Sequence, residues 1–169
     1  MKRILAVVVI LAAGSAVAAQ PADAQGNVRF GLAATGLFSL ESGGGSDFGA
    51  TGLASFGRSH GKLGFRVDAS LLRGDDEWTE LGTGNVTYGF YTPESLLHPY
   101  VLAGGGIVHV PDHTKPLVKA GAGLDYHLFH RNRGTVLFGE ATLDFLFMGD
   151  DLGGTNKSLQ VNLGLKFGD

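Results

Sequence analysis

The stretch LAGGGIVHV, residues 102–110, places three consecutive glycines before an apolar run. A glycine-rich loop can bind phosphate when its backbone N–H groups surround the anion and a helix follows. Such a loop also carries Gly-Lys-Ser or Gly-Lys-Thr, and neither sequence follows Gly106. A strand that needs small side chains is therefore a better interpretation of this stretch than a nucleotide-binding loop.

The sequence HVPDH brings three potential metal ligands close together, namely His109, Asp112 and His113. Imidazole and carboxylate groups can bind a divalent cation. Pro111 lies between the two histidines and excludes a helix, so their i, i+4 spacing does not place them on one helical face. We therefore interpret these residues as solvated loop side chains and predict no metal site.

Two further arrangements could support acid–base or nucleophilic chemistry. Asp125 and His127 lie two residues apart, and an aspartate that orients a histidine can make it a general base. An interior polar network is the favoured interpretation of this pair. Ser59 and His60 are adjacent in a short turn, but no acidic partner completes a triad. The sequence therefore predicts no catalytic residue, no bound cofactor and no enzymatic activity.

The first 24 residues have the pattern of a cleavable secretory signal peptide. Two basic residues precede the apolar run 4–13, which is too short to span a bilayer. Ala-x-Ala motifs at 16–18 and 22–24 offer two cleavage sites, between which the sequence does not decide. We expect export of residues 25–169 as one domain.

The composition narrows the function of this domain. The chain has no cysteine, which excludes disulfides, thiolate metal sites and cysteine nucleophiles. Its net charge is −3, so nothing suggests nucleic acid as a partner. It contains 28 glycines but few prolines and no low-complexity repeat. These features favour a tightly packed exported β-structure.

Polar and apolar residues alternate with a period of two through most of residues 27–167, which predicts β-strands. Eight segments show it, and polar loops or short turns connect them: 28–40, 48–56, 62–72, 83–91, 100–110, 117–129, 136–147 and 158–167. Their lengths exceed the ~5–6 residues of ordinary strands and suit tilted strands that cross a bilayer. The predicted fold is an all-β, eight-stranded, antiparallel up-and-down transmembrane β-barrel.

The two faces of these strands predict which side meets lipid. Charged and amide residues occupy one face and would form a polar network in the lumen: Arg29, Arg66, Asp68, Asn85, Lys119, Asp125, His127, Glu140, Asp144, Asn162 and Lys166. Aromatic residues on the other face gather near strand ends and would form girdles at both membrane interfaces: Phe30, Phe38, Phe48, Phe56, Phe65, Tyr88, Phe90, Tyr100, Tyr126, Phe145, Phe147 and Phe167.

The glycine-rich stretch also receives a predicted orientation. We expect Leu102, Gly104, Gly106, Val108 and Val110 to face lipid, with the alternate residues in the lumen. Two of those alternate residues, at 103 and 105, would then leave space for charged side chains of neighbouring strands. Glycine on both faces would also let the strand bend as the barrel closes.

The chain resembles the outer-membrane-protein β-barrel domain family of small, eight-stranded OmpA/OmpX-like and porin-like proteins. The resemblance rests on the signal peptide, the alternating segments, HPYVLAGGGIV (98–108) and the closing strand LQVNLGLKF (159–167). Members typically end in an aromatic residue that the assembly machinery reads. Here Phe167 is followed by Gly168 and Asp169. The resemblance implies a bacterial, Gram-negative outer-membrane location.

These observations lead to one functional prediction and two alternatives. We expect an integral outer-membrane protein with a structural or surface-binding role and a lumen filled by side chains, without a wide pore. Its expected partners are outer-membrane lipid, the assembly machinery and an extracellular ligand bound by acidic loops at 41–47, 73–82 and 148–157. The alternatives are a soluble lipocalin-like barrel that binds an apolar ligand inside, and a lipid-modifying barrel enzyme.

Overall fold

A computed structural model describes the barrel and parts of its connections. The described residues are 27–57, 63–74, 77–90, 95–110, 113–128, 134–147 and 155–168. The predicted signal peptide and the Ser59-His60 turn lie outside them. Within the described ranges, no helix is long and apolar enough to cross a membrane.

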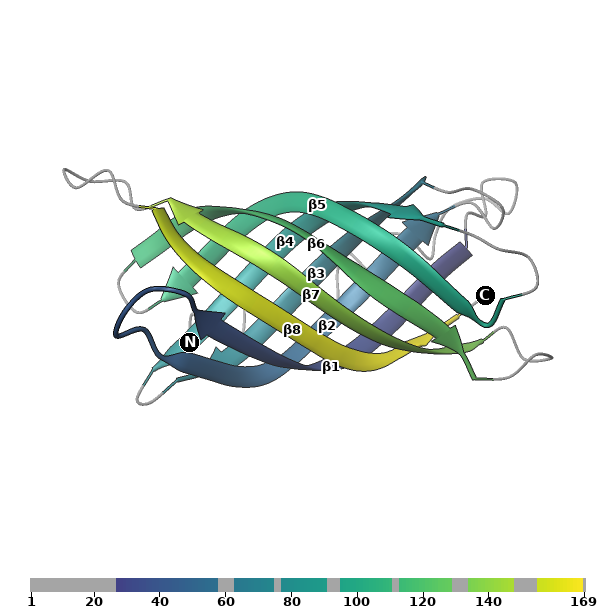
Figure 1. Ribbon diagram of the computed structural model, residues 1–169, viewed down its shortest axis with the longest axis horizontal. Coiled ribbons are helices and arrows are strands. Elements are labelled where there is room, and N and C mark those ends of the chain that lie inside the picture. The colour runs from purple at the N-terminus through teal and green to yellow at the C-terminus, as the bar shows by residue number, and fades with distance from the viewer. Residues whose placement is uncertain are drawn as a thin grey trace, which may run out of the picture.

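Eight antiparallel strands follow one another around a closed barrel (Figure 1). They are β1 (Asn27–Ser39), β2 (Ser46–Gly57), β3 (Leu63–Arg73), β4 (Trp78–Gly89), β5 (Leu97–Val110), β6 (His113–His127), β7 (Thr135–Phe147) and β8 (Thr155–Phe167). The predicted number, order and hairpin connectivity of the strands are confirmed.

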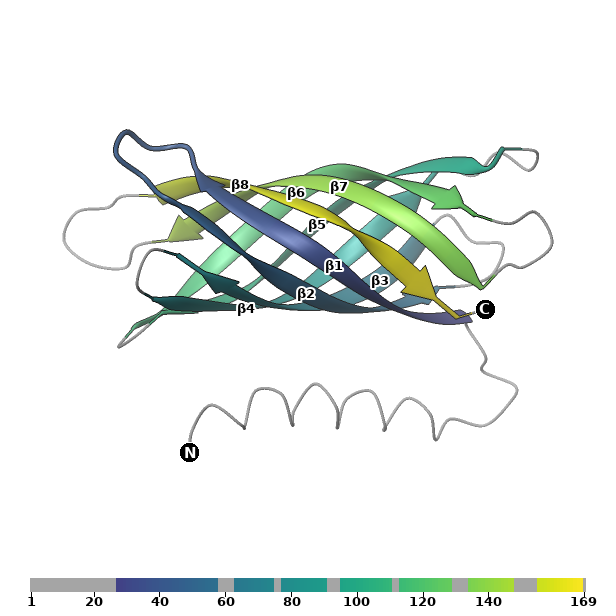
Figure 2. The same ribbon diagram turned by 90° about the horizontal axis from the view of Figure 1, so that it is seen from below.

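Pairing of β1 with β8 closes the barrel, and these two strands lie side by side in Figure 2. Leu32 pairs with Leu165, and Phe38 pairs with Leu159. Closure leaves no strand edge, so backbone groups along the wall have partners within the ladder. β1 begins and β8 ends at the same end of the barrel, where Phe30 pairs with Phe167 (Figure 2).

Several strands extend beyond the predicted boundaries at the opposite end. β4 begins at Trp78 instead of Thr83, and β8 begins at Thr155 instead of Ser158. The predicted loop 73–82 is correspondingly short, and Gly74 N–H donates to the Glu77 carbonyl across it at 3.0 Å. Polar residues mark where a strand leaves an apolar environment, but ladder hydrogen bonds can continue past that point. Polarity therefore predicts the end of an apolar band better than the end of a strand.

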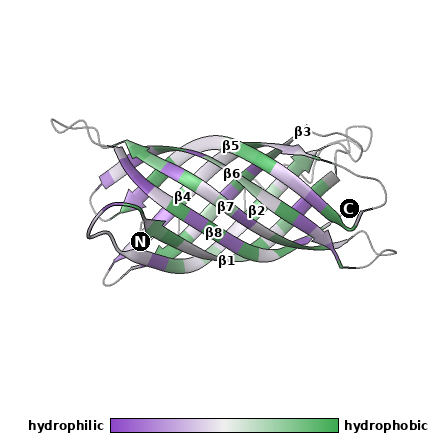
Figure 3. Ribbon diagram, viewed as in Figure 1, coloured by the Kyte–Doolittle hydropathy of each residue, from purple (hydrophilic) through white to green (hydrophobic). Residues whose placement is uncertain are grey.

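The alternation appears in the wall as polar and apolar positions that follow one another along each strand (Figure 3). Large apolar side chains are exposed on the outer surface, including Leu32 at 63% and Leu163 at 61%. Buried side chains point into the lumen. The packed interior of this barrel is therefore the lumen, and many of the side chains packed there are polar.

Strand β5 has the opposite phase from the prediction. Leu102 and Val108 are buried in the lumen at 3% exposure, whereas Ile107 is 54% exposed. Each alternating set of this strand has one histidine, and apart from Tyr100 the other residues are small or apolar, so hydropathy gives no phase. Cross-strand pairing decides it, because Gly104 lies opposite Asn85 on β4 and Lys119 on β6. Residues directly opposite one another share a face of the sheet, which places Gly104 in the lumen.

Gly104 and Gly106 of β5 allow the neighbouring strand β4 to approach closely, and they do not lie on the lipid-facing side that was predicted for them. A Cβ atom added at Gly106 would overlap the Gly82 carbonyl oxygen, and one at Gly104 would overlap Gly84 and Asn85. The side-chain space predicted at Ala103 and Gly105 is therefore wrong, because both residues face outward. Gly104 instead leaves room inside for Asn85.

Candidate functional site

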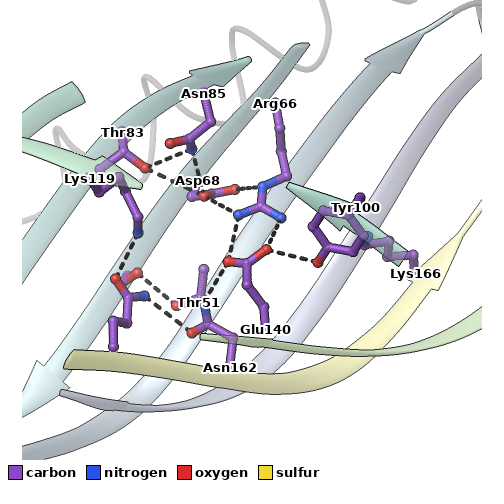
Figure 4. Close-up of polar contacts among 12 residues, drawn as sticks. Thr51, Arg66, Asp68, Thr83, Asn85, Tyr100, Lys119, Glu140, Asn162 and Lys166 are labelled. Atoms are coloured by element: carbon purple, nitrogen blue, oxygen red, sulfur yellow. Dashed lines mark hydrogen bonds and ion pairs between the residues drawn. The ribbon is translucent and has the colours of Figure 1, made fainter. Parts of the chain in front are cut away.

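The candidate site is the lumen, where side chains from distant strands meet (Figure 4). Its centre is the Arg66 guanidinium on β3, which is 2% exposed. One edge contacts Glu140 of β7, with Nη1–Oε2 at 2.6 Å and Nη2–Oε1 at 2.8 Å. The other edge contacts Asp68, with Nε–Oδ1 at 2.7 Å and Nη2–Oδ2 at 2.9 Å. Both edges therefore pair with a carboxylate, and the Glu140 edge does so through two hydrogen bonds, the bidentate geometry that suits arginine.

Glu140 uses both of its carboxylate oxygens for hydrogen bonds. In addition to Arg66, it accepts hydrogen bonds from Tyr100 Oη at 2.8 Å and Asn162 Nδ2 at 3.2 Å. Asp68 Oδ2 similarly accepts from Asn85 Nδ2 at 2.9 Å. Buried charges are tolerated when they are paired and hydrogen-bonded. This cluster meets both conditions and links β3, β4, β5, β7 and β8 across the lumen.

A second group of polar residues lies beside the first. Lys119 Nζ donates to Gln160 Oε1 at 2.8 Å, and Gln160 Nε2 donates to Asn162 Oδ1 at 3.1 Å. Asn162 joins this group to Glu140. Lys119 Nζ also lies 3.8 Å from Asp144 Oδ2, beyond hydrogen-bond distance. The two groups therefore form one connected network across β3 to β8.

A further ion pair lies toward the end of the barrel that contains the chain termini. Lys166 Nζ donates to Asp125 Oδ1 at 2.7 Å. The same ammonium lies 4.7 Å from the ring centroid of Tyr100 and 4.6 Å from that of Phe138, so cation–π contacts add to the ion pair. His127 does not join this pair; its ring lies 4.8 Å from that of His98. The arrangement of Asp125 and His127 therefore does not form the oriented acid–base pair considered from sequence.

The remaining predicted lumen residue, Arg29, lies on the lumen side of β1 near that end, outside the network. Tyr100 and Gln160 belong to the network but were absent from the predicted lumen set. Tyr100 lies on the strand whose phase was inverted. Gln160 shares the polar face of β8, and its position two residues before Asn162 was the available signal.

The aromatic residues of the predicted girdles lie on the outer surface, with one exception. Phe38 and Phe48 meet edge to face with centroids 5.7 Å apart near one end, and Tyr88 and Phe90 meet at 5.3 Å near the other. The exception is Tyr100, which is buried and hydrogen-bonded to Glu140. Its ring suits either face, and only the hydrogen-bond partner inside explains its position.

An apolar layer follows the network toward the end opposite the termini. Leu72, Leu81, Val108 and Leu117 are buried together, and Leu37, Val110 and Leu146 pack against them. Leu72 on β3 and Asn85 on β4 are fully buried. The middle of the lumen is therefore filled, first by the polar network and then by this layer.

The metal and surface-loop predictions concern the same end. His109 faces outward, and its Nδ1 lies 2.8 Å from Thr114 Oγ1; His113 begins β6, and Asp112 lies outside the described residues. Among the residues that the structure describes, no group of three His, Cys, Asp or Glu could hold a metal ion. Most of the loop expected at 148–157 also lies outside the described residues.

No family model matches the chain, and no curated protein matches it. Solved structures do. Neisserial surface protein A has a TM-score of 0.63 at 16% sequence identity, with 83% of this chain and 95% of that chain covered. OprG, an outer-membrane protein of Pseudomonas aeruginosa, has a TM-score of 0.62 at 12% identity, covering 85% and 96%. The N-terminal β-barrel domain of P. aeruginosa OprF has a TM-score of 0.55 at 20% identity, covering 85% and 100%.

Proposed function

Because the chain has the fold of small, eight-stranded outer-membrane barrels, we propose that it is an integral protein of the bacterial outer membrane. Its proposed role is structural or surface-binding, without catalysis. This proposal rests on the difference between the outer and inner faces of the barrel wall. Leu63, Leu163 and Phe48 are more than half exposed on its outer surface, while Arg66 and Glu140 are buried inside. In water such an outer surface would be costly, whereas in a bilayer it meets acyl chains.

The filled lumen supports a role other than diffusion of solutes. An eight-stranded barrel leaves an interior just wide enough for side chains. Here Arg66 contacts Asp68 and Glu140 across the centre, and the Leu72 layer lies beyond it. A wide passage would require this network and the apolar layer to separate. We therefore propose that the protein acts through its surface and its mouths.

The outer surface also supports an orientation in the membrane. Near the end that contains the termini, the outward residues are apolar or aromatic, such as Phe30, Phe65 and Tyr126. Near the opposite end, charged residues alternate with them, including Arg73, whose guanidinium lies 5.7 Å from the Trp78 ring centroid. Charged rim residues suit lipid headgroups at the cell surface. We propose that this end faces outward and that the termini face the periplasm.

The proposed partners follow from this placement. Outer-membrane lipid would cover the apolar band, and the assembly machinery would recognise the last strand. Phe167 suits that second role because it ends β8, faces outward at 47% exposure and pairs with Phe30 of β1. We place ligand binding at the outward mouth.

The lipocalin-like alternative requires the opposite arrangement of faces. A soluble carrier would have polar residues outside and an apolar cavity inside. In the described barrel the polar network and the packed apolar layer fill the middle of the lumen, and most large apolar residues lie outside, so nothing specific favours this alternative. A lipid-modifying enzyme would need a nucleophile and a base, and the adjacent Ser59 and His60 lie outside the described residues.

Cell fractionation combined with heat-modifiable gel mobility tests the proposal. We expect the protein in the outer-membrane fraction, extractable only with detergent. Unboiled samples should migrate faster than boiled ones, because a closed barrel resists unfolding by the detergent. A monomer that stays in solution without detergent would contradict the proposal.

A further inference from the structure

A cavity of about 230 Å³ opens at the proposed outward mouth of the lumen. Its floor contains Asp144 of β7 and Ser158 of β8, and Asp47 and Thr79 contribute polar atoms from β2 and β4. Its volume is below the ~300–1,000 Å³ of sites for drug-sized ligands. A ligand here would be a small molecule.

Two polar atoms of the floor have no hydrogen-bond partner within the described part of the chain. They are Asp144 Oδ2 and Ser158 Oγ. Asp144 is fully buried and Ser158 is 7% exposed. Thr142 Oγ1 donates to Asp144 Oδ1 at 2.8 Å, but Lys119 Nζ lies 3.8 Å from Oδ2 and donates to Gln160 instead. A buried carboxylate oxygen without a donor is costly. The other such oxygen among the described lumen residues, Asp68 Oδ1, lies 2.7 Å from the Arg66 Nε cation, whereas among the same residues no cationic atom lies within hydrogen-bond distance of Asp144 Oδ2.

The charge and hydrogen-bonding groups of the cavity favour a ligand that is positively charged and donates hydrogen bonds. An ionised aspartate can only accept hydrogen bonds, and a serine hydroxyl can accept as well. Asp47 adds a second carboxylate across the mouth, where its Oδ2 accepts from Thr79 at 3.3 Å. Lys157 also lines the cavity, but it occupies an outward position of β8 and is exposed. An ammonium group carries three donors and a positive charge, which complements this floor.

The rest of the wall adds an apolar requirement. Leu37, Leu81, Val108, Val110 and Leu146 line the same cavity and belong to, or pack against, the apolar layer below it. These side chains would contact the hydrocarbon part of a ligand whose charged end reaches the floor. We propose that this mouth binds small primary ammonium compounds that carry a short apolar chain.

This inference deepens the proposed function by naming a ligand class for the surface-binding role. The inference depends on the proposed function in one respect only: the proposed orientation in the membrane determines from which side the ligand reaches the cavity. The binding test uses folded protein in detergent micelles, and fractionation tests membrane location separately. A protein that reaches the outer membrane but binds no amine would overturn the inference alone.

Calorimetric titration of the detergent-folded full chain with n-butylammonium chloride tests the proposal. n-Butanol and sodium n-butyrate serve as the neutral and anionic probes with the same chain. We expect binding of butylammonium and at least about tenfold weaker binding of the other two, equivalent to 1.4 kcal/mol. Equal binding of butanol and butylammonium would overturn the proposal, as would no binding of butylammonium by protein with the mobility of a closed barrel.

Two variants and a matched control locate the site. Asp47→Asn removes the rim carboxylate and Ser158→Ala removes the unpartnered hydroxyl, and each should weaken butylammonium binding. Glu80→Gln makes the same charge change near the same end but on the outer surface, so its affinity should equal that of the wild type. Unchanged affinity in both cavity variants, or the same loss in Glu80→Gln, would contradict a site in this cavity. Gel mobility identifies any variant that fails to fold, and the remaining cavity variant then decides.

Discussion

The inner and outer faces of one strand meet different surroundings. On β3, Phe65 and Leu71 face outward and are 47% exposed, while Arg66 and Asp68 face inward and are at most 4% exposed. The inner residues depend on specific partners, because each buried charge needs an opposite charge and hydrogen bonds. The outer residues need only an apolar surrounding, which a bilayer supplies. Inner substitutions should therefore break contacts that an outer substitution does not, and outer substitutions should matter only through the membrane.

The largest effect is expected from Arg66→Met. The change removes the cation between Asp68 and Glu140 and leaves two carboxylates buried without it. Breaking a buried pair from one side costs about 3–5 kcal/mol. Urea unfolding of the protein in lipid vesicles, followed by gel mobility, measures the loss in free energy of unfolding.

Arg73→Met is the matched control for that change, since Arg73 lies on the same strand and faces outward. We expect it to change the free energy of unfolding by less than about 0.5 kcal/mol. A similar loss in both variants would remove the distinction between the two faces.

A charge in the middle of the outer surface should have the next largest effect. Leu163→Lys places an ammonium in the apolar band, where it costs about 2–4 kcal/mol in a bilayer. Thr155→Lys, near the end of β8, should cost about 0–1 kcal/mol by comparison. The same vesicle assay measures both. Equal stability of Leu163→Lys and the wild type in vesicles would contradict lipid contact at this position.

The space available for an added methyl group at a glycine should differ between the inner and outer faces of the wall. The Cβ of Gly106→Ala would overlap the backbone of β4, whereas nothing lies within 4 Å of a Cβ at Gly52, which faces outward. Forcing extra volume into a packed site costs about 1–3 kcal/mol. We therefore expect Gly106→Ala to lower the free energy of unfolding and Gly52→Ala to leave it unchanged or raise it. The reverse order would contradict the inward orientation of Gly106.

The smallest effect is expected from single tyrosine hydroxyls. Tyr100→Phe removes one of the donors to Glu140, and a typical intramolecular hydrogen bond contributes about 1 kcal/mol. Tyr126→Phe, on the outer surface of β6, is the control and should be neutral in the same assay. An effect at Tyr126 that equals the effect at Tyr100 would show that the network does not depend on this hydroxyl.

The sequence alone predicted the barrel, its eight antiparallel strands and the face of seven of them. It could do so because a strand with one polar and one apolar face shows its phase directly in a period of two. Residues such as Arg66, Glu140 and Lys119 carried that signal. The strand 97–110 did not, because its two faces have similar hydropathy, and Tyr100 was consequently assigned to the wrong side.

Only the tertiary structure decided which lumen residues are partners. Arg66 and Glu140 are 74 residues apart, and the register around the closed barrel brings them to 2.6 Å. The same register fixed the phase of β5 through Asn85 and Lys119. Local alternation determines on which side of a strand a residue lies, because it depends only on the backbone period. Which residues meet across the lumen depends on strand register and closure, and these are properties of all eight strands together.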